Sequence, residues 1–211
     1  MSAAPHSPRP SAPRVGGLVL AAGGSRRFGG RKQLAELDGR PLLEHALAAM
    51  AAAGVAPVVV TVGAHADEIA ATVALHGATP VRVPGWEEGL AASLRAGVAA
   101  LAPCCDAIVV TLGDQPRIAP AAIGRVAAAA GAPEPAARAS YDGRPGHPVL
   151  LSRELFAAIA ALRGDDGARE LLATVPVLAV ACEGGDLRDV DTPADLAAMR
   201  RRQPEPSCAP A

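Results

Sequence analysis

Short aliphatic runs alternate with helical segments along this chain of 211 residues. The aliphatic runs are almost continuously apolar, at residues 15–22, 58–62, 81–83 and 107–112. Strands covered by helices on both faces have this composition, whereas strands with one face in water alternate apolar and polar residues. Helical spacing occurs between the runs, at residues 41–53, 66–75, 90–101 and 120–130. This order predicts an α/β fold in which a doubly wound, mostly parallel, Rossmann-like sheet lies between two layers of helices.

The second half of the chain is less regular but continues the same domain. Short strands are expected at residues 137–141, 146–151 and 177–182, helices at 153–162, 167–173 and 193–202, and an extended piece at 187–191. Residues 1–14 and 203–211 are rich in Pro, Ala and Ser, with too little apolar surface to offset the entropy of ordering. We therefore expect one domain over residues 15–202 between two disordered tails.

The charge balance and the scarcity of aromatic residues exclude several classes of partner. Lys and Arg number 20 and Asp and Glu number 21, so the net charge of −1 provides no general surface for nucleic acid or membrane. Aromatic residues make up 2%, too few for stacking on single-stranded nucleic acid. We expect neither nucleic acid nor membrane among the partners.

The compartment is predicted from the cysteines and the apolar runs. None of the four cysteines lies in a CxxC pair, which favours incidental thiols in a reducing environment: Cys104, Cys105, Cys182 and Cys208. No uninterrupted apolar run is long enough to span a bilayer, and prolines occupy the place of a signal-peptide core. A cytoplasmic protein is expected.

The loop after the first apolar run, LAAGGSRRFGGRK at residues 20–32, predicts a polyphosphate site. It offers glycines, free N–H groups and a hydroxyl, together with four cations: Arg26, Arg27, Arg31 and Lys32. In a parallel sheet, ligands bind beyond the carboxyl ends of the strands, where this loop begins. The loop fits neither GxGxxG nor GxxxxGK[ST], which disfavours a hydride-transfer enzyme and a P-loop ATPase. A solvated basic turn is the structural alternative.

Six segments, in order, resemble motifs of the MobA-like nucleotidyltransferases. The loop resembles LAAGxSxRMGxxK, with Phe28 in place of Met. The other five resemble W-x-x-G-x-x-x-S-L-x-x-G, GDQP, GHPV, GDxGAR and DIDTP, at residues 86–97, 113–116, 146–149, 165–169 and 189–193. The chain is most similar to the molybdenum cofactor cytidylyltransferases, which read LAAG where the guanylyl enzymes read LAGG. Ala22 therefore favours CTP.

This resemblance implies the nucleotidyltransferase version of the fold and a reaction. A cytidylyl group would pass from CTP to the phosphate of a molybdopterin-type acceptor, with release of pyrophosphate. A guanylyltransferase, or transfer to another phosphorylated acceptor, is the alternative among enzymes. A non-catalytic nucleotide- or cofactor-binding module that assists insertion into another enzyme is the alternative of a different class. A molybdoenzyme or its maturation chaperone is the macromolecular partner implied.

Three aspartates are the candidate metal ligands. Asp114 directly follows the apolar run at 107–112, so it lies at the ligand-binding edge of the sheet and can hold Mg²⁺, with Mn²⁺ as an alternative. The resemblance implies Asp191 as the second ligand and Asp189 as a helper or the actual ligand. Carboxylates brought together without a cation would repel one another. Turn capping by Asp114 and support of a helix start by Asp189 or Asp191 are the structural alternatives.

The remaining site residues divide between nucleotide and acceptor. Arg27 and Lys32 would stabilise the charge on the leaving pyrophosphate, which makes them catalytic with Asp114. The nucleotide would contact Leu20, Ala21, Ala22, Gly23, Gly24, Ser25, Gly89 and Ser93. His147 and Arg169 are candidates for the acceptor, although His147 could equally be structural. Trp86 is a candidate wall of the site or a packing residue, and an exposed helix position is the alternative for Ser93.

Overall fold

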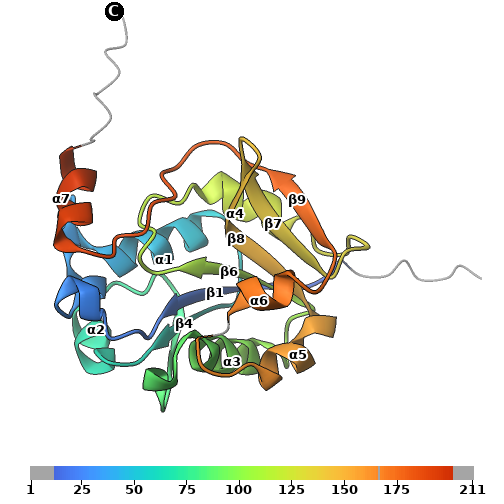
Figure 1. Cartoon of the computed structure of the whole chain (residues 1–211), viewed down its shortest axis with the longest axis horizontal. Coiled ribbons are helices and arrows are strands. Elements are labelled where there is room, and N and C mark those ends of the chain that lie inside the picture. Colours follow the sequence, from blue (N-terminus) through green and yellow to red (C-terminus); the bar gives the residue numbers. More distant parts are fainter. Residues whose placement is uncertain (1–11, 166, 202–211) are drawn as a thin grey trace, which may run out of the picture.

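The computed structural model describes residues 12–165 and 167–201, and its centre is a seven-stranded sheet (Figure 1). The strand order is β5-β4-β1-β6-β8-β7-β9. The strands are β1 (Val15–Ala21), β4 (Val58–Val62), β5 (Thr79–Arg82), β6 (Ala107–Leu112), β7 (Ala136–Tyr141), β8 (Arg144–Ser152) and β9 (Val177–Ala181). All the predicted strands occur, within two residues of the expected ends.

The sheet is mostly parallel, as predicted. β1 pairs in parallel with β4 and β6, β4 with β5, and β7 with β9. β8 is the exception, because it is antiparallel to both β6 and β7. The β7–β8 hairpin turns at Asp142 and Gly143, whose φ angles of 50° and 79° suit the tight turn that the right-handed twist of strands favours.

Helices cover both faces of the sheet and give the predicted three layers (Figure 1). The helices are α1 (Leu42–Ala52), α2 (Ala66–Thr72), α3 (Leu90–Leu101), α4 (Pro120–Ala127), α5 (Phe156–Ala161), α6 (Ala168–Leu172) and α7 (Pro193–Arg201). α1, α2 and α4 share one core with the sheet, and α3, α5 and α6 share the other. Neighbouring strand residues alternate between the two cores: Leu18 and Val59 enter one, and Val19 and Val60 enter the other.

Two parts of the fold lie outside the sequence prediction. A small hairpin of β2 (Glu36–Leu37) and β3 (Arg40–Pro41) packs with α7 in a separate cluster that includes Leu37, Val190 and Met199. The helix predicted at 153–162 begins as a 3-10 turn before α5.

The ends of the chain fall largely outside the described residues, as does Cys208. Within the predicted N-terminal tail, Arg14 is attached to the domain, because its N–H donates to Asp106 Oδ2 at 2.9 Å and its carbonyl accepts from Asp106 N at 2.7 Å. Cys104, Cys105 and Cys182 are free thiols. No helix in the described part of the chain is long and apolar enough to span a bilayer.

Candidate functional site

A cleft of about 690 Å³ opens at the carboxyl ends of β1 and β6. Its lining includes every residue predicted to contact the nucleotide: Leu20, Ala21, Ala22, Gly23, Gly24, Ser25, Gly89 and Ser93. It also includes the predicted catalytic and metal-binding side chains: Arg27, Lys32, Asp114, Asp189 and Asp191. The structure therefore gathers into one cleft residues that are up to 171 positions apart in the chain (191 − 20).

The loop after β1 is held in place by Gln33, which the sequence interpretation missed. Its side chain is only 6% exposed, and Nε2 donates to the carbonyl oxygens of Ala21 at 3.0 Å and Gly23 at 2.8 Å. Its Oε1 accepts from Ser25 Oγ at 3.2 Å. Ser25 has a φ of 55°, a left-handed conformation that a non-glycine residue keeps only where its surroundings enforce it. Gln33 therefore fixes the path of the loop along the cleft.

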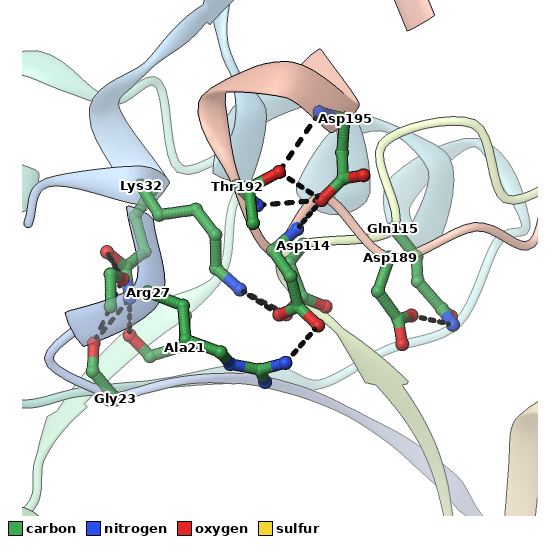
Figure 2. A network of polar contacts seen from close by, with 12 residues as sticks. Ala21, Gly23, Arg27, Lys32, Asp114, Gln115, Asp189, Thr192 and Asp195 are labelled. Atoms are coloured by element: carbon green, nitrogen blue, oxygen red, sulfur yellow. Dashed lines mark hydrogen bonds and ion pairs between the residues drawn. The ribbon is translucent and has the colours of Figure 1, made fainter. Parts of the chain in front are cut away.

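A cluster of opposite charges forms the floor of the cleft (Figure 2). Lys32 Nζ lies 2.7 Å from Asp114 Oδ2 and 3.2 Å from Asp191 Oδ1, and Arg27 Nη1 lies 2.9 Å from Asp191 Oδ2. The Lys32 side chain is only 12% exposed, so water weakens these attractions less than it does at an open surface. Three distant segments of the chain thus meet at one ammonium group.

Asp189 stands beside this cluster and is held by Gln115. Gln115 Nε2 donates to Asp189 Oδ1 at 2.7 Å and to the Leu187 carbonyl at 3.3 Å (Figure 2). Partial removal from water raises the pKa of the Asp189 carboxyl, and the charges of Asp114 and Asp191 raise it further. Three carboxyl groups therefore face the same part of the cleft.

The start of α7 positions Asp191. Thr192 Oγ1 accepts from Asp195 N at 3.2 Å, and Asp195 Oδ2 accepts from Thr192 N at 2.8 Å and Asp191 N at 3.2 Å. This reciprocal cap between Thr192 and Asp195 satisfies main-chain N–H groups at the start of α7. Because Asp195 supplies the capping carboxylate, the side chain of Asp191 remains directed to Lys32 and Arg27.

The donor set fits a divalent cation that shares its coordination with a ligand. Asp114 Oδ1 is buried and has no hydrogen-bond partner among the described residues. Residues 12–165 and 167–201 contain no group of three or more His, Cys, Asp or Glu side chains placed to hold a metal ion. A hard cation bound by Asp114 and Asp191 would therefore complete its shell with phosphate oxygens and water, as Mg²⁺ commonly does.

The opposite wall is the start of α3 and the loop before α6. Ser93 is 5% exposed, so the alternative of an exposed helix position is wrong. Gly89 has a φ of 123°, and a Cβ there would collide with Asp165. Asp165 lines the cleft and has no hydrogen-bond partner within the described ranges. From the sequence motif at 165–169 only Arg169 was predicted as a site residue, so the contribution of Asp165 to the cleft was missed.

Trp86 forms part of the wall by packing over two glycines. A Cβ on Gly24 would lie 2.7 Å from Trp86 Cζ3, and a Cβ on Gly63 would lie 2.7 Å from Trp86 Cγ. The indole also packs against the small buried cluster of Ala22, Val83 and Ala92. Both interpretations of Trp86 therefore hold, since it packs against the loop and lines the cleft.

Three residues expected near the ligands lie elsewhere. Arg31 turns away from the cleft, and its Nε lies 3.4 Å from Glu68 Oε2, which corrects the expectation that all four loop cations face one polyphosphate. His147, on β8, and Arg169, on α6, do not line this cleft. Burial lowers the pKa of His147 to about 4, with the charge of Arg138 acting in the same direction and that of Asp114 opposing it.

Acidification is expected to destabilise the protein through His147. Its pKa is 6.5 when unperturbed and about 4 in the fold, so the unfolded chain alone takes up this proton between those values. The contribution of neutral His147 to stability is complete above pH 6.5 and is lost as pH falls toward 4. We expect wild type to lose about 2–3 kcal/mol more than His147→Asn between pH 7 and pH 4.5, measured by urea unfolding. Equal losses in the two proteins would contradict this.

The chain is similar to a known protein family over most of its length. The sequence profile described as the MobA-like NTP transferase domain matches residues 17–180. The chain is also 36% identical over 191 residues to a protein named nicotine blue oxidoreductase from Paenarthrobacter nicotinovorans, covering 85% of this chain and 93% of that relative. It is 31% identical over 206 residues to purine catabolism protein PucB of Bacillus subtilis strain 168, covering 90% and 97%.

Solved structures agree with these similarities. The crystal structure of Rv0371c from Mycobacterium tuberculosis H37Rv superposes with a TM-score of 0.82 at 36% identity, over 90% of this chain and 99% of that one. A structure of Rv0371c in complex with manganese gives a TM-score of 0.78 at 32% identity, over 90% of this chain and 100% of that one. The similarity therefore extends over the sheet, the cleft and both layers of helices.

Proposed function

Because this chain belongs to the MobA-like NTP transferase family, whose profile spans most of its domain, we propose that it transfers a cytidylyl group from CTP to the phosphate of a molybdopterin-type acceptor. The cluster of Lys32, Asp114 and Asp191 in a cleft beside the LAAGGSRR loop is the observation that carries the proposal. The products are a cytosine dinucleotide form of the cofactor and pyrophosphate. A molybdoenzyme or its chaperone would be the recipient.

The reaction needs positioning and charge compensation more than a strong base. An oxygen of the acceptor phosphate attacks the α-phosphorus of CTP, a new P–O bond forms, and the bond to the β-phosphate oxygen breaks as pyrophosphate leaves in line. A phosphate monoester is already ionised near neutral pH, so it requires no proton acceptor. Arg27 and Lys32 stabilise the negative charge that grows on the leaving group.

Asp114 and Asp191 would hold a divalent cation, Mg²⁺ or Mn²⁺, with Asp189 beside them. Such an ion, when bound, supplies positive charge to the α- and β-phosphate oxygens. The unpartnered Asp114 Oδ1 and the manganese complex of the mycobacterial Rv0371c protein support this assignment.

One relative has a name that denotes a redox reaction, and this defines the competing hypothesis. The loop after β1 contains no GxGxxG, the spacing typical of nicotinamide or flavin dinucleotide sites, and its side chains are suited to a triphosphate. Oxidation of NADH by this protein in the presence of a quinone-type dye would support the redox hypothesis. We expect no such oxidation.

The direct test is release of pyrophosphate from CTP in the presence of Mg²⁺ and molybdenum-loaded molybdopterin. We expect release that depends on all three components. Pyrophosphate release with GTP instead of CTP would favour the guanylyl alternative, and release only with a different phosphorylated acceptor would replace the acceptor. Binding of CTP without any turnover would favour the non-catalytic module.

The preference for CTP over GTP is expected to be about 10²-fold or more in kcat/KM. Ala22 in the LAAG motif and buried Ser93 motivate this, because a site that hydrogen-bonds one base edge leaves polar groups unpaired when the wrong base binds. Steady-state pyrophosphate release with each nucleotide measures the ratio, and Ser93→Ala should narrow it. Similar efficiencies with CTP and GTP would contradict the base assignment and leave the reaction class intact.

A further inference from the structure

The loop after β1 contains three consecutive residues in left-handed conformations: Gly29, Gly30 and Arg31, with φ angles of 87°, 98° and 49°. Glycine adopts this region readily, whereas a residue with a Cβ keeps it only where its surroundings enforce it. Arg31 is therefore the residue of this run whose conformation needs a cause. A 3-10 turn over Lys32–Leu34 begins directly after it, so the backbone at Arg31 decides where Lys32 points.

His65, at the start of α2, holds the main chain of Arg31. The Arg31 N–H donates to His65 Nε2 at 3.2 Å, across the contact between the loop and α2 (Figure 1). A main-chain N–H can only donate, so Nε2 is the unprotonated acceptor nitrogen and the ring proton lies on Nδ1. Nδ1 lies 3.6 Å from Glu68 Oε1, whose negative charge favours the proton at that position. Glu68 therefore supports the tautomer of His65 that accepts from Arg31.

The turn that carries His65 is also attached to the start of the same loop. Ala64 N donates to the Ala22 carbonyl at 3.3 Å. The side chain of His65 is mostly buried, with 20% exposed, so the ring has little freedom to move. One turn of the chain therefore binds the loop at both of its ends, at Ala22 and at Arg31.

The position of Lys32 depends on this attachment. Its Nζ lies 2.7 Å from Asp114 Oδ2 and 3.2 Å from Asp191 Oδ1 (Figure 2). If the backbone at Arg31 took a right-handed or extended conformation, the chain would leave the loop in another direction and carry Lys32 away from these carboxylates. Within residues 12–165 and 167–201, the lining of the cleft includes neither Arg31 nor His65. An effect of His65 on chemistry in the cleft must therefore pass through the loop.

We propose that His65 is a positioning residue for nucleotidyl transfer, which holds the left-handed turn at Arg31 and thereby brings Lys32 into the cleft. The inference rests on the proposed function for the reaction that Lys32 serves, while the hydrogen bond that holds the turn can be tested without any substrate. The role requires only a hydrogen-bond acceptor at the place of Nε2. Glutamine, whose amide oxygen accepts, should replace His65, and leucine should not.

Amide hydrogen exchange followed by NMR tests the hydrogen bond in the free protein. We expect the Arg31 N–H to be protected in wild type and His65→Gln, and to exchange about tenfold faster in His65→Leu. His76→Asn is the matched control, because His76 lies 3.7 Å from Glu44 outside the cleft lining and asparagine tolerates its φ of 48°. Exchange of the Arg31 N–H at the wild-type rate in His65→Leu would overturn the proposal.

Unchanged protection of the β6 amides establishes that each variant folds. His65→Ala, which should behave as His65→Leu does, takes its place if leucine prevents folding.

Steady-state transfer then separates positioning from packing. We expect His65→Leu to lower kcat about tenfold with little change in CTP binding, and His65→Gln to stay within about twofold of wild type. In a Lys32→Ala background, His65→Leu should lower kcat no further, because its effect passes through Lys32. Equal losses in the leucine and glutamine variants, or an equal loss in both backgrounds, would overturn the positioning role. Absence of transfer by wild type, with the expected exchange pattern, would instead contradict the proposed function alone.

Discussion

Asp114→Asn is expected to abolish nucleotidyl transfer in a protein that still folds. Asparagine keeps the shape of the side chain and suits the turn after β6. The main-chain hydrogen bond at this position, from Val190 N to the Asp114 carbonyl oxygen at 3.0 Å, does not depend on the side chain. The substitution removes the negative charge that pairs with Lys32 at 2.7 Å and that a divalent cation requires. We expect turnover to fall about 10²–10³-fold or more, as it does when a charge-stabilising group is lost from an active site.

Turnover across a Mg²⁺ titration, with circular dichroism to establish folding, measures the effect. Asp67→Asn is a suitable control, because Asp67 pairs with Arg82 on the exposed surface away from the cleft. If Asp114 serves only the turn, the variant keeps most of its activity. A folded Asp114→Asn protein with more than about a tenth of the wild-type rate would overturn the assignment.

Lys32→Ala should reduce kcat about 10²–10³-fold while weakening CTP binding much less. The ammonium group lies within 3.2 Å of both Asp114 and Asp191, so it is fixed before the substrate binds. Its charge gains value as negative charge accumulates on the departing pyrophosphate, and it therefore favours the transition state over bound CTP. Removing it also leaves two carboxylates facing each other, which should lower the free energy of unfolding.

Arg31→Ala is the matched control for Lys32, since it removes a cation from the same loop that pairs with Glu68 instead. Single-turnover rates and equilibrium CTP binding separate the two effects. A Lys32→Ala protein with near-normal kcat and a raised KM would show that the residue binds ground state and transition state equally.

Short sequence patterns predicted the strands and the residues that directly follow them, because these depend mainly on neighbouring residues in the chain. The continuous apolar run of β6 identified a buried strand, and its end placed Asp114 at the cleft because parallel strands collect their ligands at that edge. The antiparallel direction of β8 was not predicted from the apolar pattern, since a strand buried on both faces reads alike in either direction. The Asp142-Gly143 turn was the available signal.

The missed site residues depend on contacts that no short pattern contains. Gln33 reaches back 10 and 12 residues to the carbonyls of Gly23 and Ala21, and a buried amide has no periodicity of its own. Asp165 enters the cleft because the Gly164 carbonyl accepts from Ala91 N at 3.1 Å and Arg95 Nη1 donates to the Leu162 carbonyl at 2.7 Å. Arg31 lies outside the predicted cluster because it pairs with Glu68, which is not in the cleft.

The position of Trp86 gives this protein an optical property. It is the single tryptophan of the chain, and its indole lies over Gly24 and Gly63 in the wall of the nucleotide cleft. Intrinsic tryptophan fluorescence of the whole protein is therefore emitted from one place, within reach of whatever enters that cleft. Nucleotide binding can be followed in the unlabelled protein by the intensity and wavelength of that emission. Events at the far ends of the sheet are expected to leave the emission unchanged.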